Sequence, residues 1–141
     1  SHFDYTAFFK KATSGRKLVK AIAYATDRGD DRQLRFQNIL RKIGFEVKLT
    51  PFIQRADGSA KGDWDVGIAL DMVEYAKQAD VLVLASGDGD FTPVVGELLG
   101  EHSLSIDVYG VRGLTASSLV RTATSFTPIE GSLLMPIPTT W

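Results

Sequence analysis

The stretch VLVLASGDGDF, residues 81–91, joins a wholly apolar run to a turn that contains two glycines and two aspartates. Five consecutive apolar residues that end at such a turn are typical of a strand covered on both faces. Strands of that kind occur in parallel sheets with helices packed on either side. The stretch therefore predicts an α/β fold, with the turn at the carboxyl end of a central strand.

The segments around this stretch alternate between strand and helix patterns. Residues 30–43 place their apolar side chains on one stripe, and Gly44 is suited to end that helix. Such alternation predicts one domain over residues 1–141, a three-layer α/β/α sandwich with a mainly parallel central sheet. We expect strands at 18–25, 45–49, 81–85 and 104–109, helices at 30–43, 63–77, 90–99 and 114–122, a polar loop at 51–62 and an apolar tail at 133–141.

Composition excludes several classes of protein. The 141 residues are 44% hydrophobic and 23% charged, as expected for one ordinary globular domain. Without cysteine there can be no disulfide, thiolate zinc site or cysteine nucleophile, which fits a cytoplasmic protein. No apolar run reaches the length of a membrane span, and no signal peptide is visible at the first residues. The net charge of −1 means that any nucleic-acid surface must be a local patch.

Two aspartates, Asp88 and Asp90, follow the central strand directly. Ligands of open α/β sheets bind outside the carboxyl ends of the strands, and paired carboxylates there suit a hard cation such as Mg²⁺. A structural interpretation stays open for each residue alone. Asp90 would then cap the following helix, and Asp88 would be an ordinary turn residue.

A third carboxylate, Asp65, heads the buried face expected for the helix at 63–77. Four apolar residues follow it at helical spacing, namely Ile68, Ala69, Met72 and Ala76. A favourable interaction with the helix dipole would also explain an acidic residue there. An acidic group in line with core positions needs a partner, however, and a metal shared with Asp88 would supply one. Asp71 lies off this stripe and is a weaker metal-ligand candidate.

Basic residues surround the polar loop. Those of the preceding helix, among them Arg41 and Lys42, we interpret as a solvated face. Lys61 differs because it precedes Asp65 by four residues, where it can hold a phosphate near the metal. Ser86, beside the aspartate pair, is a second candidate contact for substrate.

Other sequence signatures fit less well. Asp88-Gly89-Asp90-Phe91-Thr92 matches the D-x-D-x-T string of haloacid dehalogenase-like phosphatases, which we keep as a second alternative. That family needs a downstream lysine and a downstream acidic pair, and the chain has no lysine after Lys77. An EF-hand loop, a P-loop and a dinucleotide fingerprint each lack a required residue.

Three strings together resemble the LabA-like NYN proteins of the PIN-like nuclease group. They are KGDWDV at 61–66, LDM at 70–72 and VLASGDGDF at 83–91. Their order is similar to the family's K-G-x-D-V…D…S-G-D-x-D-F pattern, with one extra residue before Asp65. The resemblance implies a PIN-like sheet between helices and metal-dependent cleavage of RNA. Asp65, Asp88 and Asp90 match its acidic metal-site positions, and Asp71 matches a further one.

The chain departs from that family in two places. The family often has an Ala-Asp-x-Phe string where this chain reads ATSF at 123–126, so an accessory carboxylate is missing. The family also opens with a strand that ends in an aspartate, whereas Ser1 is followed by what looks like the next helix. We therefore expect a segment upstream of Ser1, rather than the tail at 133–138, to pair between the strands at 18–25 and 81–85.

These observations predict an endoribonuclease that uses Mg²⁺ or Mn²⁺. Asp65, Asp88 and Asp90 would hold the metal and carry out catalysis, and Lys61 and Ser86 would contact the substrate. Single-stranded RNA is the expected partner, because its backbone can bend into a cleft. The alternative is a LabA-like regulatory or RNA-binding module that does not cut, and either protein could form a homo-oligomer.

Overall fold

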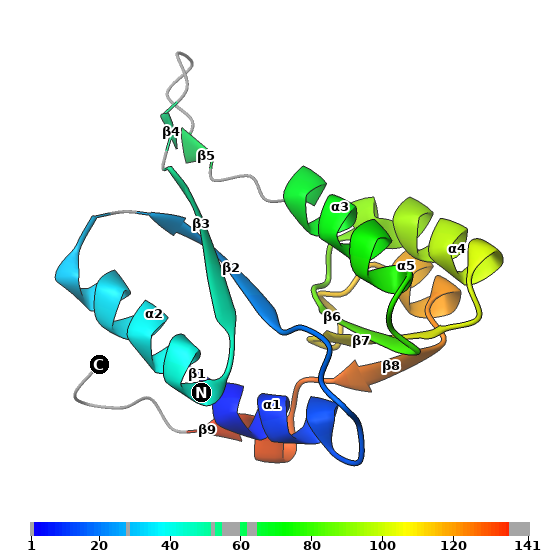
Figure 1. Cartoon of the computed structure of the whole chain (residues 1–141), viewed down its shortest axis with the longest axis horizontal. Coiled ribbons are helices and arrows are strands. Elements are labelled where there is room, and N and C mark those ends of the chain that lie inside the picture. Colours follow the sequence, from blue (N-terminus) through cyan, green and yellow to red (C-terminus); the bar gives the residue numbers. More distant parts are fainter. Residues whose placement is uncertain (1, 28, 52, 55–59, 62–64, 136–141) are drawn as a thin grey trace.

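The structure, a computed structural model, describes residues 2–27, 29–51, 53–54, 60–61 and 65–135. Helices and strands alternate through most of these residues (Figure 1). The strands are β1 (His2–Phe3), β2 (Ile22–Asp27), β3 (Glu46–Pro51), β4 (Ile53–Gln54), β5 (Ala60–Lys61), β6 (Val81–Ala85), β7 (Ser105–Gly110), β8 (Ser125–Pro128) and β9 (Leu134–Met135). The helices are α1 (Tyr5–Thr13), α2 (Asp31–Ile43), α3 (Asp65–Ala76), α4 (Thr92–Glu101) and α5 (Ser117–Thr122), with 3₁₀ turns η1 (Gly89–Phe91) and η2 (Gly131–Leu133).

A parallel sheet of order β6-β7-β8 lies between two layers of helix. Alternate residues of its strands face opposite sides, as the pleat requires. Leu84 and Val108 join the main core with α3, α4 and α5, whereas Tyr109 packs on the other side against Phe8 of α1. This arrangement confirms the predicted layers and explains why the run at 81–85 is wholly apolar.

A second parallel pair, β2-β3, lies beside that sheet, and α2 connects its two strands (Figure 1). Asp30 caps the start of α2 by accepting a hydrogen bond from the Gln33 amide, and Gly44 ends the helix with a φ of 134°. Within the described residues, β2 pairs only with β3 and β6 only with β7. The two parallel sheets are therefore not joined to each other by backbone hydrogen bonds.

Helix α1 connects the two sheets through aromatic side chains. Phe8 meets Tyr109 of β7 edge to face, with ring centroids 5.0 Å apart. On the next residue, the ring of Phe9 lies 5.2 Å from that of Phe45, which precedes β3. Directly before α1 in the chain, β1 pairs antiparallel with β9. The N-terminal helix thus holds both sheets from one side.

The structure corrects several predicted boundaries. The strand predicted at 18–25 begins only at Ile22, and the Leu18 and Val19 side chains are exposed. The predicted loop at 51–62 contains the paired strands β4 and β5. The helix predicted at 90–99 opens as the 3₁₀ turn η1, and the one at 114–122 begins at Ser117. Strands β1, β8 and β9 were not predicted, because SFTP and the two-residue segments carry no strand periodicity.

None of the helices in the described part of the chain has the length and apolar character needed to cross a membrane.

Candidate functional site

The turn after β6 carries the two predicted aspartates and is built by short local hydrogen bonds. The Ser86 amide donates to the Tyr109 carbonyl at 3.0 Å, which continues the pairing of β6 with β7. The side-chain Oγ of Ser86 accepts a hydrogen bond from the Asp88 amide at 3.2 Å. Asp88 Oδ1 accepts from the Asp90 amide at 2.8 Å, which caps η1. The cap of α4 is Phe91, with no side-chain bond, so the interpretation of Asp90 as a helix cap is wrong.

Two glycines bring this turn into close contact with the segment before α5. A Cβ added to Gly87 would lie 3.0 Å from the Leu114 carbonyl oxygen, and one on Gly89 would lie 3.0 Å from Ala116 Cβ. The Ala116 amide donates to the Gly87 carbonyl at 3.0 Å. The backbone that carries both aspartates is therefore held in place, and larger residues at the two glycines would displace it.

The carboxylates of this turn fit a hard cation. Asp88 and Asp90 are both exposed. Asp88 Oδ2 and both oxygens of Asp90 accept no hydrogen bond within the described residues, so they remain available as ligands. The described residues hold no group of three acidic or histidine side chains close enough to share an ion. The turn thus offers two carboxylates, and a third ligand would have to come from another part of the molecule.

Two predicted site residues fall at the border of the described structure. Asp65 begins α3 and Lys61 ends β5, but the side chains of both lie outside what the structure describes. Residue 63 lies wholly outside the described residues. The face that Asp65 was predicted to head is present, because Met72 and Ala76 are buried in the core. The assignments of Asp65 as a metal ligand and of Lys61 as a phosphate contact stay predictions.

Asp71, the weaker metal-ligand candidate, lies in a separate polar cluster. Its Oδ2 accepts from the Tyr24 hydroxyl at 2.6 Å and from Lys48 Nζ at 2.8 Å. Tyr24 and Lys48 are paired residues on β2 and β3, so this cluster connects the second parallel pair to α3. Sequence reasoning missed Tyr24, since nothing in a single strand pattern shows which helix its hydroxyl will reach.

The pKa values within this cluster show how strongly its charges are held. Burial alone would raise the pKa of Asp71, but the hydrogen bonds from Lys48 and Tyr24 outweigh it and lower that pKa. The hydrogen bond to Asp71 raises the pKa of Lys48. Burial, followed by the hydrogen bond to Asp71, raises the pKa of Tyr24. Asp71 is thus an ionised carboxylate that already has two partners.

Asp71→Asn is expected to destabilise the fold at neutral pH and to have less effect in acid. The lowered pKa of Asp71 means that its charge stabilises the fold fully above its ordinary value of 3.8. That stabilisation is lost as the pH falls through the lowered value. The pair is partly exposed and screened, so the difference at pH 7 should be about 1 kcal/mol. Urea unfolding at pH 7 and pH 3 measures it, and an undiminished difference at pH 3 would contradict the role of the charge.

Comparisons with known proteins place the chain among relatives. The model of the NYN domain family matches residues 1–130. The "Low amplitude and bright protein LabA" of Synechococcus elongatus is 32% identical over 109 residues, which cover 73% of this chain and 58% of that protein. A crystal structure of a protein of unknown function from Vibrio parahaemolyticus matches with a TM-score of 0.90 and 47% identity, over 96% of this chain and 83% of that one.

Proposed function

Since the chain belongs to the NYN domain family, we propose that it is a metal-dependent endoribonuclease. Family membership indicates an RNA-related function. The observation that carries the proposal is the turn after β6, which presents Asp88 and Asp90 with three carboxylate oxygens, Asp88 Oδ2 and both of Asp90, that accept no hydrogen bond from a described group. Exposed carboxylates with free oxygens at the end of a central strand suit the binding of Mg²⁺ or Mn²⁺.

The residues of the turn would have distinct roles in phosphodiester hydrolysis. Asp88 and Asp90, with Asp65, would hold the divalent ion, which when bound activates water and stabilises the leaving oxygen. Lys61 would neutralise a phosphate of the RNA substrate, and Ser86 would contact the RNA strand beside the bond that is cleaved.

One observation favours the alternative, a regulatory RNA-binding module that does not cut. Asp71 would extend the acidic set, but it is already engaged by Lys48 and Tyr24. Two available carboxylates form a weaker cation site than three or four. The alternative therefore gains if no further acidic residue reaches the turn.

We further propose that an extended segment pairs between β2 and β6 and completes the acidic set. Each of these strands has one hydrogen-bonded neighbour within the described residues, and parallel strands of this kind are usually paired on both sides. Any sequence that the gene encodes upstream of Ser1 is one test of this proposal. A strand pattern ending in an aspartate there would support it, and its absence would favour the module that does not cut.

Cleavage assays test the proposed function directly. The intact protein should cut a labelled, unstructured RNA in Mn²⁺ or Mg²⁺ and should stop when a chelator removes the metal. A matched DNA of the same sequence shows whether the 2′-hydroxyl is required. Binding of the RNA without cutting in any of these metals would contradict the nuclease and favour the regulatory module.

A further inference from the structure

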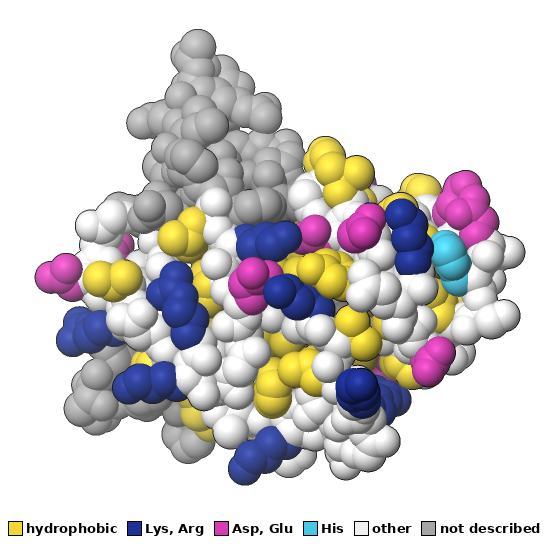
Figure 2. All heavy atoms as spheres, in the orientation of Figure 1, with side chains coloured by type: hydrophobic (Ala, Val, Ile, Leu, Met, Phe, Trp, Pro, Cys, Tyr) yellow, Lys and Arg dark blue, Asp and Glu magenta, His cyan; other side chains and the backbone are white. Residues whose placement is uncertain are grey.

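Charge is divided unevenly along this nearly neutral chain. Residues 1–49 contain 11 Lys and Arg against 5 Asp and Glu, whereas residues 50–141 contain 5 against 12. Figure 2 shows the result on one face, where dark blue side chains gather over the half formed by α1, α2, β2 and β3. The net charge of −1 therefore conceals a basic half and an acidic half, and the acidic half contains the aspartate turn.

Most cations of the basic half lie on α1 and α2. These helices carry six lysines and arginines and one acidic residue, Asp31, and all seven side chains are exposed. Within the described residues, none of the six makes an ion pair; the salt bridges of this half, Lys20–Glu46 and Lys48–Asp71, lie on and beside the strands. Unpaired exposed cations on adjacent helices favour the binding of a polyanion.

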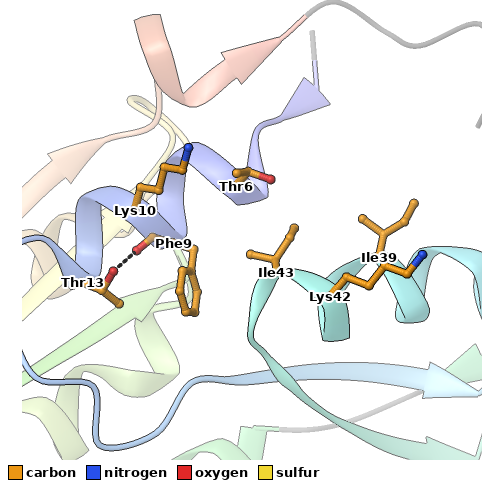
Figure 3. Close-up of a pocket in the computed structure, with 7 residues that line it drawn as sticks. All are labelled: Thr6, Phe9, Lys10, Thr13, Ile39, Lys42 and Ile43. Carbon is orange, nitrogen blue, oxygen red and sulfur yellow. Dashed lines mark hydrogen bonds between the residues drawn. The ribbon is translucent and has the colours of Figure 1, made fainter.

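The two helices also enclose a groove. It has a volume of about 510 Å³ and is lined by Phe9 and Thr13 of α1 and by Ile39 and Ile43 of α2. Lys10 from α1 and Lys42 from α2 flank these apolar side chains (Figure 3). An apolar floor with an ammonium group on each helix suits a ligand that has flat apolar groups on a charged backbone.

The cations of α2 continue from this groove along one side of the helix. Arg32, Arg35, Ile39 and Lys42 follow one another at intervals of three, four and three residues, which places them on one face. Arg41 lies off that face and donates to the Asn38 side chain. The basic groove, defined as Lys10 and Lys42 with the apolar side chains between them, is thus one end of a longer basic stripe.

We propose that the basic groove binds single-stranded RNA away from the aspartate turn. The inference rests on the proposed function for the identity of the polyanion. Phosphates would lie along Lys10, Lys42 and the arginines of α2, and unstacked bases would contact the apolar floor. A groove in the basic half would hold the strand, because the acidic half without metal repels phosphate.

RNA binding tests this proposal when it is measured in the presence of a chelator, which removes the metal and prevents cleavage. The double variant Lys10→Gln/Lys42→Gln should weaken the binding of a labelled oligouridylate roughly tenfold near 0.1 M salt. It should also reduce the slope of log K against log salt by about 1.4, since each phosphate contact to a single strand contributes about 0.7. Ile39→Asn, at an exposed position, should weaken binding without changing that slope.

A matched control separates the groove from net charge. Lys11→Gln/Arg41→Gln removes the same charge from the same two helices, outside the groove lining, and should weaken binding less than threefold. Equal losses in the two double variants would overturn the proposal. So would displacement of the RNA by poly-L-glutamate at equal charge concentration, which would assign the groove to acidic protein segments.

The design also distinguishes this proposal from the nuclease. Cleavage of a dinucleotide, which is too short to reach both sites, should be the same in the groove variant and the unmodified protein. If the protein binds RNA through the groove but never cuts, the groove stands and the proposed nuclease fails. If it cuts but both double variants bind alike, the nuclease stands and the groove fails.

Discussion

Asp88→Asn is expected to abolish metal-dependent RNA cleavage and leave the fold intact. Loss of a group that only orients a metal ligand typically costs 10–100-fold in activity or affinity, so removing a ligand should cost at least about 100-fold. Asparagine keeps a side-chain oxygen that can accept the hydrogen bond from the Asp90 amide, so the cap of η1 survives the change. Initial cleavage rates in Mn²⁺, and calorimetric titration of the same ion, measure the two effects.

Asp80→Asn is the matched control for this result. Asp80 is exposed and lies immediately before β6, at the opposite end of the strand from the turn. The same loss of charge there should leave the cleavage rate and Mn²⁺ affinity unchanged. Equal Mn²⁺ binding by Asp88→Asn and the unmodified protein would refute the metal site, and persistent cleavage by that variant would place the activity elsewhere.

Gly87→Ala is expected to cost about 1–3 kcal/mol of stability and to weaken Mn²⁺ binding, because the added methyl group overpacks the turn. Its Cβ would lie 3.0 Å from the Leu114 carbonyl oxygen and 3.2 Å from Thr115 Cα. Both are backbone atoms, and the hydrogen bond from the Ala116 amide to the Gly87 carbonyl prevents the segments from simply separating. Urea unfolding and Mn²⁺ titration measure the two losses.

Gly100→Ala is expected to increase the stability of the fold, the opposite of the effect of Gly87→Ala. Gly100 lies near the end of α4, and a Cβ added there would meet no atom within 4 Å. The same methyl group should stabilise the fold by about 0.5–1 kcal/mol, because alanine loses less backbone entropy in a helix. Similar destabilisation by the two substitutions would show that the turn is no more tightly packed than an exposed helix.

The sequence predicted the elements whose pattern is local. The apolar run of β6 and the capped, striped helix α2 each carry their signal within a few residues, and both are confirmed. Strand β8 was missed because its partners, Asp107 to Gly110 of β7, decide its conformation. Short paired segments such as β1 and β9 likewise depend on contacts between residues far apart in the chain.

The candidate site was predictable in part for a similar reason. The turn after β6 lies within one stretch of sequence, so its two aspartates could be recognised as neighbours. The engagement of Asp71 by Tyr24 and Lys48 depends on how α3 sits over another sheet, which no spacing in the sequence encodes. The groove between α1 and α2 was missed too, because Lys42 was interpreted as part of a solvated face and Lys10 of the other helix was not considered beside it.

The separate backbone ladders of β2-β3 and β6-β7-β8 have a consequence for how the molecule opens. Among the described residues, side chains rather than shared amide bonds connect the two sheets, notably the Asp71 cluster and the aromatic rings of α1. Cooperative units that communicate through few contacts unfold with different free energies. Without the segment proposed to pair between β2 and β6, the β2-β3 unit should therefore exchange its amide hydrogens through sub-global openings that leave the main core closed.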